Sequence, residues 1–232
     1  MNRPDFIVSL IAASATSGAR PSAVSADIAI KRDANELLAP FTVSIALHNA
    51  TQRIVPLDFP TAELYRIDVQ HEDRTVWSTA TGHKPIQIAR RLQVPPGTTR
   101  LVSQIVDGTT DDRRAYEPGR YVVRVAMLGS SLSTTLERAL DFAPPLRIAD
   151  ALKTKTGTVV TIAGVPAGET GAALLKDDTG SLKLSRPLGV RPTGKYVVRG
   201  YLDALGNDMQ FDVGRFAPAF DNVLQARPAP SA

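Results

Sequence analysis

Alternation of apolar and polar residues with a period of two is the feature that most constrains how this chain can fold. In residues 41–47 every second side chain is a large apolar one, from Phe41 to Leu47. That period belongs to a β-strand, whose successive side chains point to opposite faces. Segments of this kind recur along the chain. One is expected at residues 86–94 and ends at the turn formers Pro95-Pro96-Gly97. The pattern predicts an all-β protein with strands joined by turns.

Pro144-Pro145 divides the expected strands into two groups. The spacing before this break is that of an antiparallel sandwich, and the shorter stretch after it suits a small five-stranded barrel. A short helical turn is expected at residues 150–155. The expected parts are a signal peptide or flexible tail at 1–26, a sandwich at 27–143, a linker at 144–149, a barrel at 150–217 and a disordered tail at 218–232.

The first residues resemble a secretory signal. Arg3 precedes an apolar run at residues 6–13, and small-residue cleavage patterns follow at Ala13-Ser14-Ala15 and Val24-Ser25-Ala26. The run is too short to span a bilayer. We therefore expect a secreted or periplasmic protein that is cleaved after Ala15 or Ala26. The alternative is a flexible tail on a cytoplasmic protein.

The composition argues against catalysis. The chain has no cysteine, and its three histidines, His48, His71 and His83, lie in separate segments without metal-binding spacing. No nucleophile elbow and no glycine-rich phosphate loop occurs in the sequence. The net charge of +4 is small for a nucleic-acid-binding protein. We expect that the protein is not an enzyme, binds no cofactor or metal, and contains no membrane-spanning segment.

Five segments of the first group together resemble the intracellular proteinase inhibitor domain of bacilli, the BsuPI type. The resemblance covers about residues 41–128. Its pieces are an early strand ending in an Asn turn, a strand leading into a Tyr segment, a Trp strand, a Pro-Gly turn and a Gly-x-Tyr that opens a final strand. They stand here at 43–49, 54–67, 76–78, 92–98 and 119–121.

The resemblance implies an immunoglobulin-like sandwich and inhibition of a serine proteinase. The chain departs from the family pattern at three places. Thr61-Ala62 stands where the family has Ser-Gly, Arg66 replaces an Asp, and Thr98 replaces a Glu. An identical partner is therefore not implied.

The loop at residues 79–85 is the candidate contact for such a partner. It contains Thr81, Gly82, His83 and Lys84, just before Pro85. A proteinase that prefers basic residues would accept Lys84 in its primary pocket, and the bond before Pro85 resists cleavage. An ordinary rigid loop is the alternative reading. The polar loop at 107–114 is the next candidate.

Residues 150–217 resemble a bacterial OB-fold through Val160-x-Ile162-x-Gly164, the turn at 175–180 and a glycine in mid-strand, Gly200. The OB-fold uses one barrel face for nucleic acids, sugars or proteins. Three basic residues are expected on that face, Lys176, Lys183 and Arg186. No aromatic residue lies on the second or third expected strand to stack a base, which argues against nucleic acid.

The sequence therefore predicts a non-catalytic bacterial protein-binding module, with proteinase inhibition as its leading function. The first alternative is an envelope adaptor whose barrel holds a carbohydrate or a protein. The weaker alternative is binding of single-stranded nucleic acid through the barrel.

Overall fold

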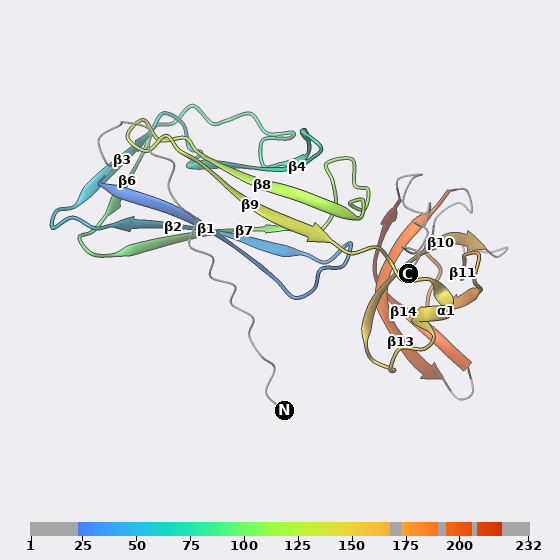
Figure 1. Cartoon of the computed structure of the whole chain (residues 1–232). Coiled ribbons are helices and arrows are strands. Elements are labelled where there is room, and N and C mark those ends of the chain that lie inside the picture. Colours follow the sequence, from blue (N-terminus) through green and yellow to red (C-terminus); the bar gives the residue numbers. More distant parts are fainter. Residues whose placement is uncertain (1–22, 168–172, 190–193, 206–207, 220–232) are drawn as a thin grey trace.

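The computed structural model describes residues 23–167, 173–189, 194–205 and 208–219, and they form two β units (Figure 1). The first unit contains β1 (Val24–Arg32), β2 (Phe41–Asn49), β3 (Val55–Phe59), β4 (Tyr65–His71), β5 (Arg74–Ser78), β6 (Arg90–Val94), β7 (Thr99–Val106), β8 (Gly119–Met127) and β9 (Thr135–Phe142). The second contains α1 (Ile148–Ala151), β10 (Val159–Ala167), β11 (Leu174–Lys176), β12 (Ser181–Leu184), β13 (Tyr196–Leu205) and β14 (Asp208–Pro218). The expected all-β fold, a sandwich followed by a five-stranded barrel, is confirmed.

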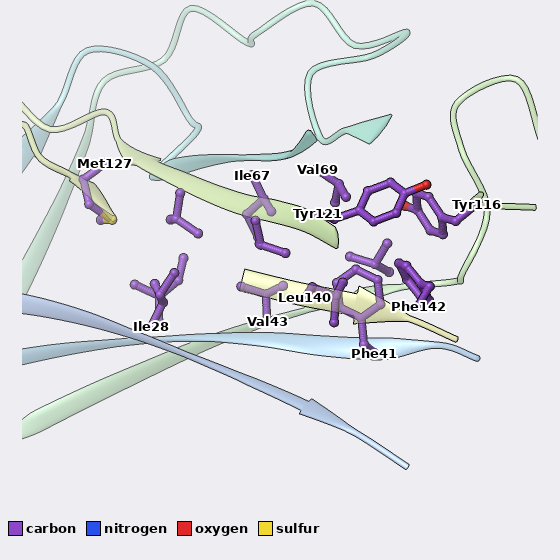
Figure 2. Packing of buried hydrophobic residues seen from close by; sticks show 14 of the residues in the cluster. Ile28, Phe41, Val43, Ile67, Val69, Tyr116, Tyr121, Met127, Leu140 and Phe142 are labelled. Carbon is purple, nitrogen blue, oxygen red and sulfur yellow. The ribbon is translucent and has the colours of Figure 1, made fainter. Parts of the chain in front are cut away.

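Two antiparallel layers form the sandwich. One has the strand order β1-β2-β7 and the other β5-β4-β8-β9, while β3 and β6 pair as a separate ribbon. In β2 the buried residues alternate with partly buried ones from Phe41 to Leu47, as the period of two predicts. Figure 2 shows Val43 of one layer facing Ile67 of the other across a continuous apolar core.

A tyrosine closes the barrel-side end of this core. The Tyr121 hydroxyl donates to the Glu117 carbonyl oxygen at 2.9 Å, four residues upstream. This arrangement is the tyrosine corner found in immunoglobulin-like sandwiches. Tyr116 stacks on Phe142 beside it, with ring centroids 4.8 Å apart. Burial raises the pKa of the Tyr121 and Tyr116 hydroxyls well above their usual value, so both stay neutral.

The buried side chain of Asn49 joins two turns at the opposite end of the sandwich. Its amide nitrogen donates to the carbonyl oxygens of Arg53 and Val94 at 2.8 Å and of Pro95 at 3.2 Å. Its amide oxygen accepts from the backbone nitrogen and hydroxyl of Thr51. The two turns are the Asn turn and the Pro-Gly turn of the family pattern. The side-chain amide of Asn49 holds both, and all of its polar atoms are hydrogen-bonded.

The second unit is a closed barrel with the strand order β10-β11-β12-β14-β13. β12 and β14 run parallel, and the other pairs are antiparallel. This is the kind of barrel that the OB resemblance implies. Gly200 lies at a bulge in β13, and a Cβ there would stand 1.9 Å from the Asp212 carbonyl oxygen. The close strand contact therefore requires glycine at this position.

Three element bounds differ from expectation. The helical turn spans Ile148–Ala151 and not residues 150–155. Strand β6 starts at Arg90, four residues later than the apolar run suggests, because the Ile86 carbonyl already accepts from Ala62. At the far end, β14 extends to Pro218 and Ala219 is buried.

The barrel packs directly on the sandwich. Glu36 accepts a hydrogen bond from the Thr161 hydroxyl at 3.1 Å and pairs with Arg199 at 3.5 Å. The same hydroxyl also lies 3.2 Å from the Leu37 carbonyl oxygen. Small barrel residues join the sandwich core at this joint: Ala163, Val197, Ala217 and Ala219. Neighbours such as Ile162 point into the barrel instead, so the middle of β10 is covered on both faces.

Asp177 ties α1 to the barrel. Its carboxylate accepts from the backbone nitrogens of Ile148, Thr179 and Gly180 and from the Thr179 hydroxyl. Burial acts to raise the pKa of this carboxyl, but these hydrogen bonds outweigh it and hold the pKa below 3.8. The stabilisation is therefore present above about pH 4 and is lost as the pH falls below that value.

We predict that Asp177→Ala lowers the free energy of unfolding by about 1–3 kcal/mol, because it leaves the partly buried backbone N–H groups of Ile148 and Thr179 without an acceptor. Urea unfolding at pH 7 followed by circular dichroism measures the change. Asp178→Ala is the matched control, since Asp178 is exposed on the same turn. Equal stability of the two variants would contradict the role assigned to Asp177. The difference between them should shrink below pH 4.

We also propose that the two units separate as folded pieces at residues 144–149. Pro144 is exposed, whereas Leu146 already bonds to Thr161 of the barrel. We predict proteolytic cleavage near Pro144 and β-type circular dichroism from each purified fragment. The sandwich fragment should be less stable than the sandwich of the intact chain, because it lacks the contacts of Glu36 with Thr161 and Arg199 of the barrel. An unfolded fragment would show that the units share one core.

Candidate functional site

An exposed loop at residues 79–89 joins β5 to β6 (Figure 1). Every residue from Thr81 to Arg90 is exposed, and residues 83–89 have no regular secondary structure. We call this segment the 79–89 loop. It contains the four residues predicted to touch a partner: Thr81, Gly82, His83 and Lys84.

The first end of the loop is anchored to two neighbouring segments. Thr79 donates its backbone N–H to the Ile67 carbonyl at 3.0 Å, and its hydroxyl accepts from the Ile67 N–H at 3.0 Å. The Thr81 hydroxyl donates to the carboxylate of Asp111, which also lies 3.4 Å from the Ser78 nitrogen. The 79–89 loop is thus bonded to the loop at 107–114, which the sequence analysis treats as a separate candidate contact.

The second end is anchored to the segment that carries the Thr61-Ala62 departure from the family pattern. The Ala62 N–H donates to the Ile86 carbonyl at 3.0 Å. The Arg90 guanidinium donates to the Ala62 carbonyl at 3.3 Å. The loop is therefore held before and after its exposed middle.

The middle itself projects into solvent. His83 donates its N–H to the Ala80 carbonyl at 3.3 Å, which makes a tight turn. Gly82 has a φ of +73° at this turn, and nothing lies within 4 Å of the place where a Cβ would stand. A larger residue there would be strained by its backbone conformation and not by crowding. Lys84 follows at the exposed tip.

The three basic residues of the barrel do not form one site. Lys183 and Ser185 point away from buried Leu182 and Leu184, as expected. Lys176 lies on the adjacent strand, in register with Ser181. Arg186 turns away toward the sandwich.

Arg186 lines an open cavity of about 310 Å³ at the joint. Its guanidinium donates to the Val213 carbonyl at 3.0 Å. Hydrogen bonds from the Tyr201 and Ser185 side chains, with the nearby charge of Arg186, lower the pKa of Asp212. Asp107 and Arg215 also line this cavity, and the Arg215 guanidinium donates to the Asp107 carbonyl. Both arginines are thus bonded to carbonyl oxygens of the protein itself.

The histidines lie apart. His48 bonds to the Thr99 hydroxyl at 3.1 Å, and His71 stacks on Tyr121 at 4.3 Å. Among the residues that the structure describes, no group of three His, Cys, Asp or Glu side chains is placed to hold a metal.

The facing antiparallel layers define the class of the first unit, a β-sandwich, and comparison with known families identifies it further. Residues 25–132 match the family model described as intracellular proteinase inhibitor, BsuPI. The first unit is therefore a BsuPI-type domain, and the resemblance seen in the sequence is confirmed. The match covers less than half of the chain and does not reach the barrel.

Other comparisons add little. A search of curated proteins finds no match. Among solved structures, a β-glucosidase from Listeria innocua is 14% identical with a TM-score of 0.27, over 51% of this chain and 16% of that chain. A β-glucosidase from Paenibacillus barengoltzii is 8% identical with a TM-score of 0.28, over 80% of this chain and 19% of that chain. The chain thus spans less than a fifth of either enzyme, and likenesses this weak carry no argument about function.

The expected secretion is wrong. The matched family is described as intracellular, which points to the cytoplasm. One of the two cleavage patterns is also part of the fold, because cleavage after Ala26 would remove buried Val24, which pairs with Asn49 at the start of β1. The small residues there belong to a strand. The pattern ending at Ala15 lies outside the described residues. No helix in the described ranges is long and apolar enough to cross a membrane.

Sequence reasoning missed two parts of the site. It did not pair Asp111 with Thr81, which are thirty residues apart. It also assigned Ile86 and Ile88 to a strand, whereas both side chains are exposed in the loop.

We predict weak binding of single-stranded DNA, with a dissociation constant of about 10⁻⁴–10⁻⁶ M at physiological salt, because the net charge is only +4 and the Arg186 guanidinium is bonded to the Val213 carbonyl. Fluorescence anisotropy with a labelled oligonucleotide measures it. Lys153→Ala serves as a control for general charge loss, since Lys153 is exposed beside α1. Nanomolar binding that is lost in the Lys183→Ala/Arg186→Ala double variant would assign nucleic acid to the barrel.

Proposed function

We propose that this protein binds and inhibits a proteinase through the 79–89 loop of its BsuPI-type domain. One observation carries the proposal: the loop is tethered at Thr81 and Ile86 and exposed between them. An inhibitor must present its backbone without paying a large ordering cost when it binds. Tethers at both ends reduce that cost before the partner arrives.

Lys84 is the proposed anchor within the loop. It is exposed, two residues after Gly82, whose positive φ permits the turn, and directly before Pro85. An ammonium group that enters an acid-lined pocket forms a desolvated charge pair, the kind of central contact on which affinity depends. The envelope adaptor considered as an alternative does not suit a domain of an intracellular family.

Assay of the full chain against a panel of serine proteinases tests the proposal, with the inhibition constant as the readout. We predict that Lys84→Ala weakens inhibition at least about thirtyfold, equivalent to about 2 kcal/mol. Asp111→Ala should weaken it about tenfold, because the first tether is lost and the loop must be ordered on binding.

Asp112→Ala is the matched control for Asp111, since Asp112 is exposed on the same loop. It should inhibit like the unaltered chain. Absence of inhibition of every proteinase at micromolar protein would overturn the proposed function. Inhibition that survives Lys84→Ala but fails in Asp111→Ala would keep the loop and move the anchor to another of its residues.

A further inference from the structure

Two isoleucines are exposed just after the proposed anchor. The side chains of Ile86 and Ile88 are each 62% exposed, although both residues are large and aliphatic. Single exposed aliphatic residues are ordinary on a protein surface. Two of them within three residues, beside Lys84 on a loop already implicated in binding, form a small apolar patch of the kind that marks a contact with another molecule.

The backbone under these two residues is fixed. The Ile88 N–H donates to the Ile86 carbonyl at 2.8 Å, which makes a three-residue turn at Gln87. The same carbonyl accepts from Ala62 at 3.0 Å. Pro85 restricts the chain before the turn. The isoleucines are therefore presented by a constrained backbone, and their exposure does not come from a loose segment.

An open cavity of about 520 Å³ lies at the end of the loop, at Ala89 and Arg90. It is lined by Asp58, Phe59, Pro60, Ala89, Arg90, Arg91 and Ser130. Arg91 is bonded to Asp58 at 2.6 Å, and Arg90 donates to the Ala62 carbonyl. The charge of Arg91 is thus locally neutralised.

We propose that Ile86 and Ile88 occupy an apolar subsite of the target proteinase, next to the pocket that takes Lys84. The inference rests on the proposed inhibitory function and specifies its partner: a serine proteinase with a basic-selective primary pocket and an apolar subsite on the carboxyl side of it. Chain order sets this placement, because both isoleucines follow Lys84 and lie on the other side of Pro85.

A membrane surface is the other partner that exposed isoleucines beside basic residues would suit. It needs free positive charge to meet anionic lipid. Arg91 is paired with Asp58, but no ion pair among the described residues involves Lys84 or Arg90, so positive charge alone does not decide between the partners. Proteins usually lie on a membrane through an amphipathic helix, and residues 83–89 have no regular secondary structure. The observations favour the protein cleft, and the membrane becomes an outcome of the test.

The experiment compares Ile86→Ser and Ile88→Ser with Leu101→Ser in the full chain. Leu101 is an equally apolar residue, 69% exposed on strand β7, outside the loop. Each isoleucine variant should inhibit at least tenfold more weakly than the unaltered chain, while Leu101→Ser should inhibit normally. Thermal unfolding should be unchanged in all three, because none of these side chains is buried. Binding to vesicles of phosphatidylserine and phosphatidylcholine is measured in parallel.

Each outcome decides the matter. If the unaltered chain inhibits and depends on Lys84 but not on either isoleucine, the subsite is disproved and the proposed function stands. If the unaltered chain inhibits nothing, both fail together. If the isoleucine variants lose vesicle binding while inhibition is unaffected, the patch belongs to a membrane surface and the inference is overturned.

Discussion

The arrangement of the sandwich depends on the buried amide of Asn49. One side chain holds the turn after β2 and the turn after β6, with five hydrogen bonds to Arg53, Val94, Pro95 and Thr51. A buried amide with unmet hydrogen bonds is costly, so the two turns must approach each other in one geometry. This fixes the β3–β6 ribbon, which has little sheet of its own to stabilise it. The 79–89 loop ends where that ribbon begins.

The other end of the loop depends on the barrel through the segment at 107–114. Asp111 holds Thr81 of the loop. At the ends of the same segment, Arg215 donates to the Asp107 carbonyl at 2.6 Å, and Ala115 donates to the Pro218 carbonyl at 3.0 Å. Strand β14 of the barrel therefore braces the segment that tethers the loop. These contacts connect β14, the segment at 107–114 and the 79–89 loop, which are far apart in the sequence.

Local sequence predicted the strands well and their assembly poorly. The period of two identified β2 from Phe41 to Leu47, and the glycine noted in mid-strand, Gly200, lies within a strand of the barrel, β13. Nothing local shows that Ala163 faces the sandwich while Ile162 faces the barrel interior, because both are apolar. The bond between Thr81 and Asp111 is equally invisible, since it depends on how two loops meet in space. The small residues at 24–26 suited both a cleavage site and a strand, and the strand is correct.

The joint places strand β14 where it is bonded to both ends of the segment that tethers the 79–89 loop. Glu36 meets both Thr161 and Arg199 of the barrel while the Leu37 carbonyl lies beside the same threonine hydroxyl. A partly buried carboxylate is stabilised by such partners, and it loses them if the barrel tilts. The small side chains of Ala163 and Val197 let the barrel strands approach the sandwich closely. A barrel seated in this way holds β14 against residues 107–115. The support that residues 107–115 give to the 79–89 loop therefore depends on the joint between barrel and sandwich.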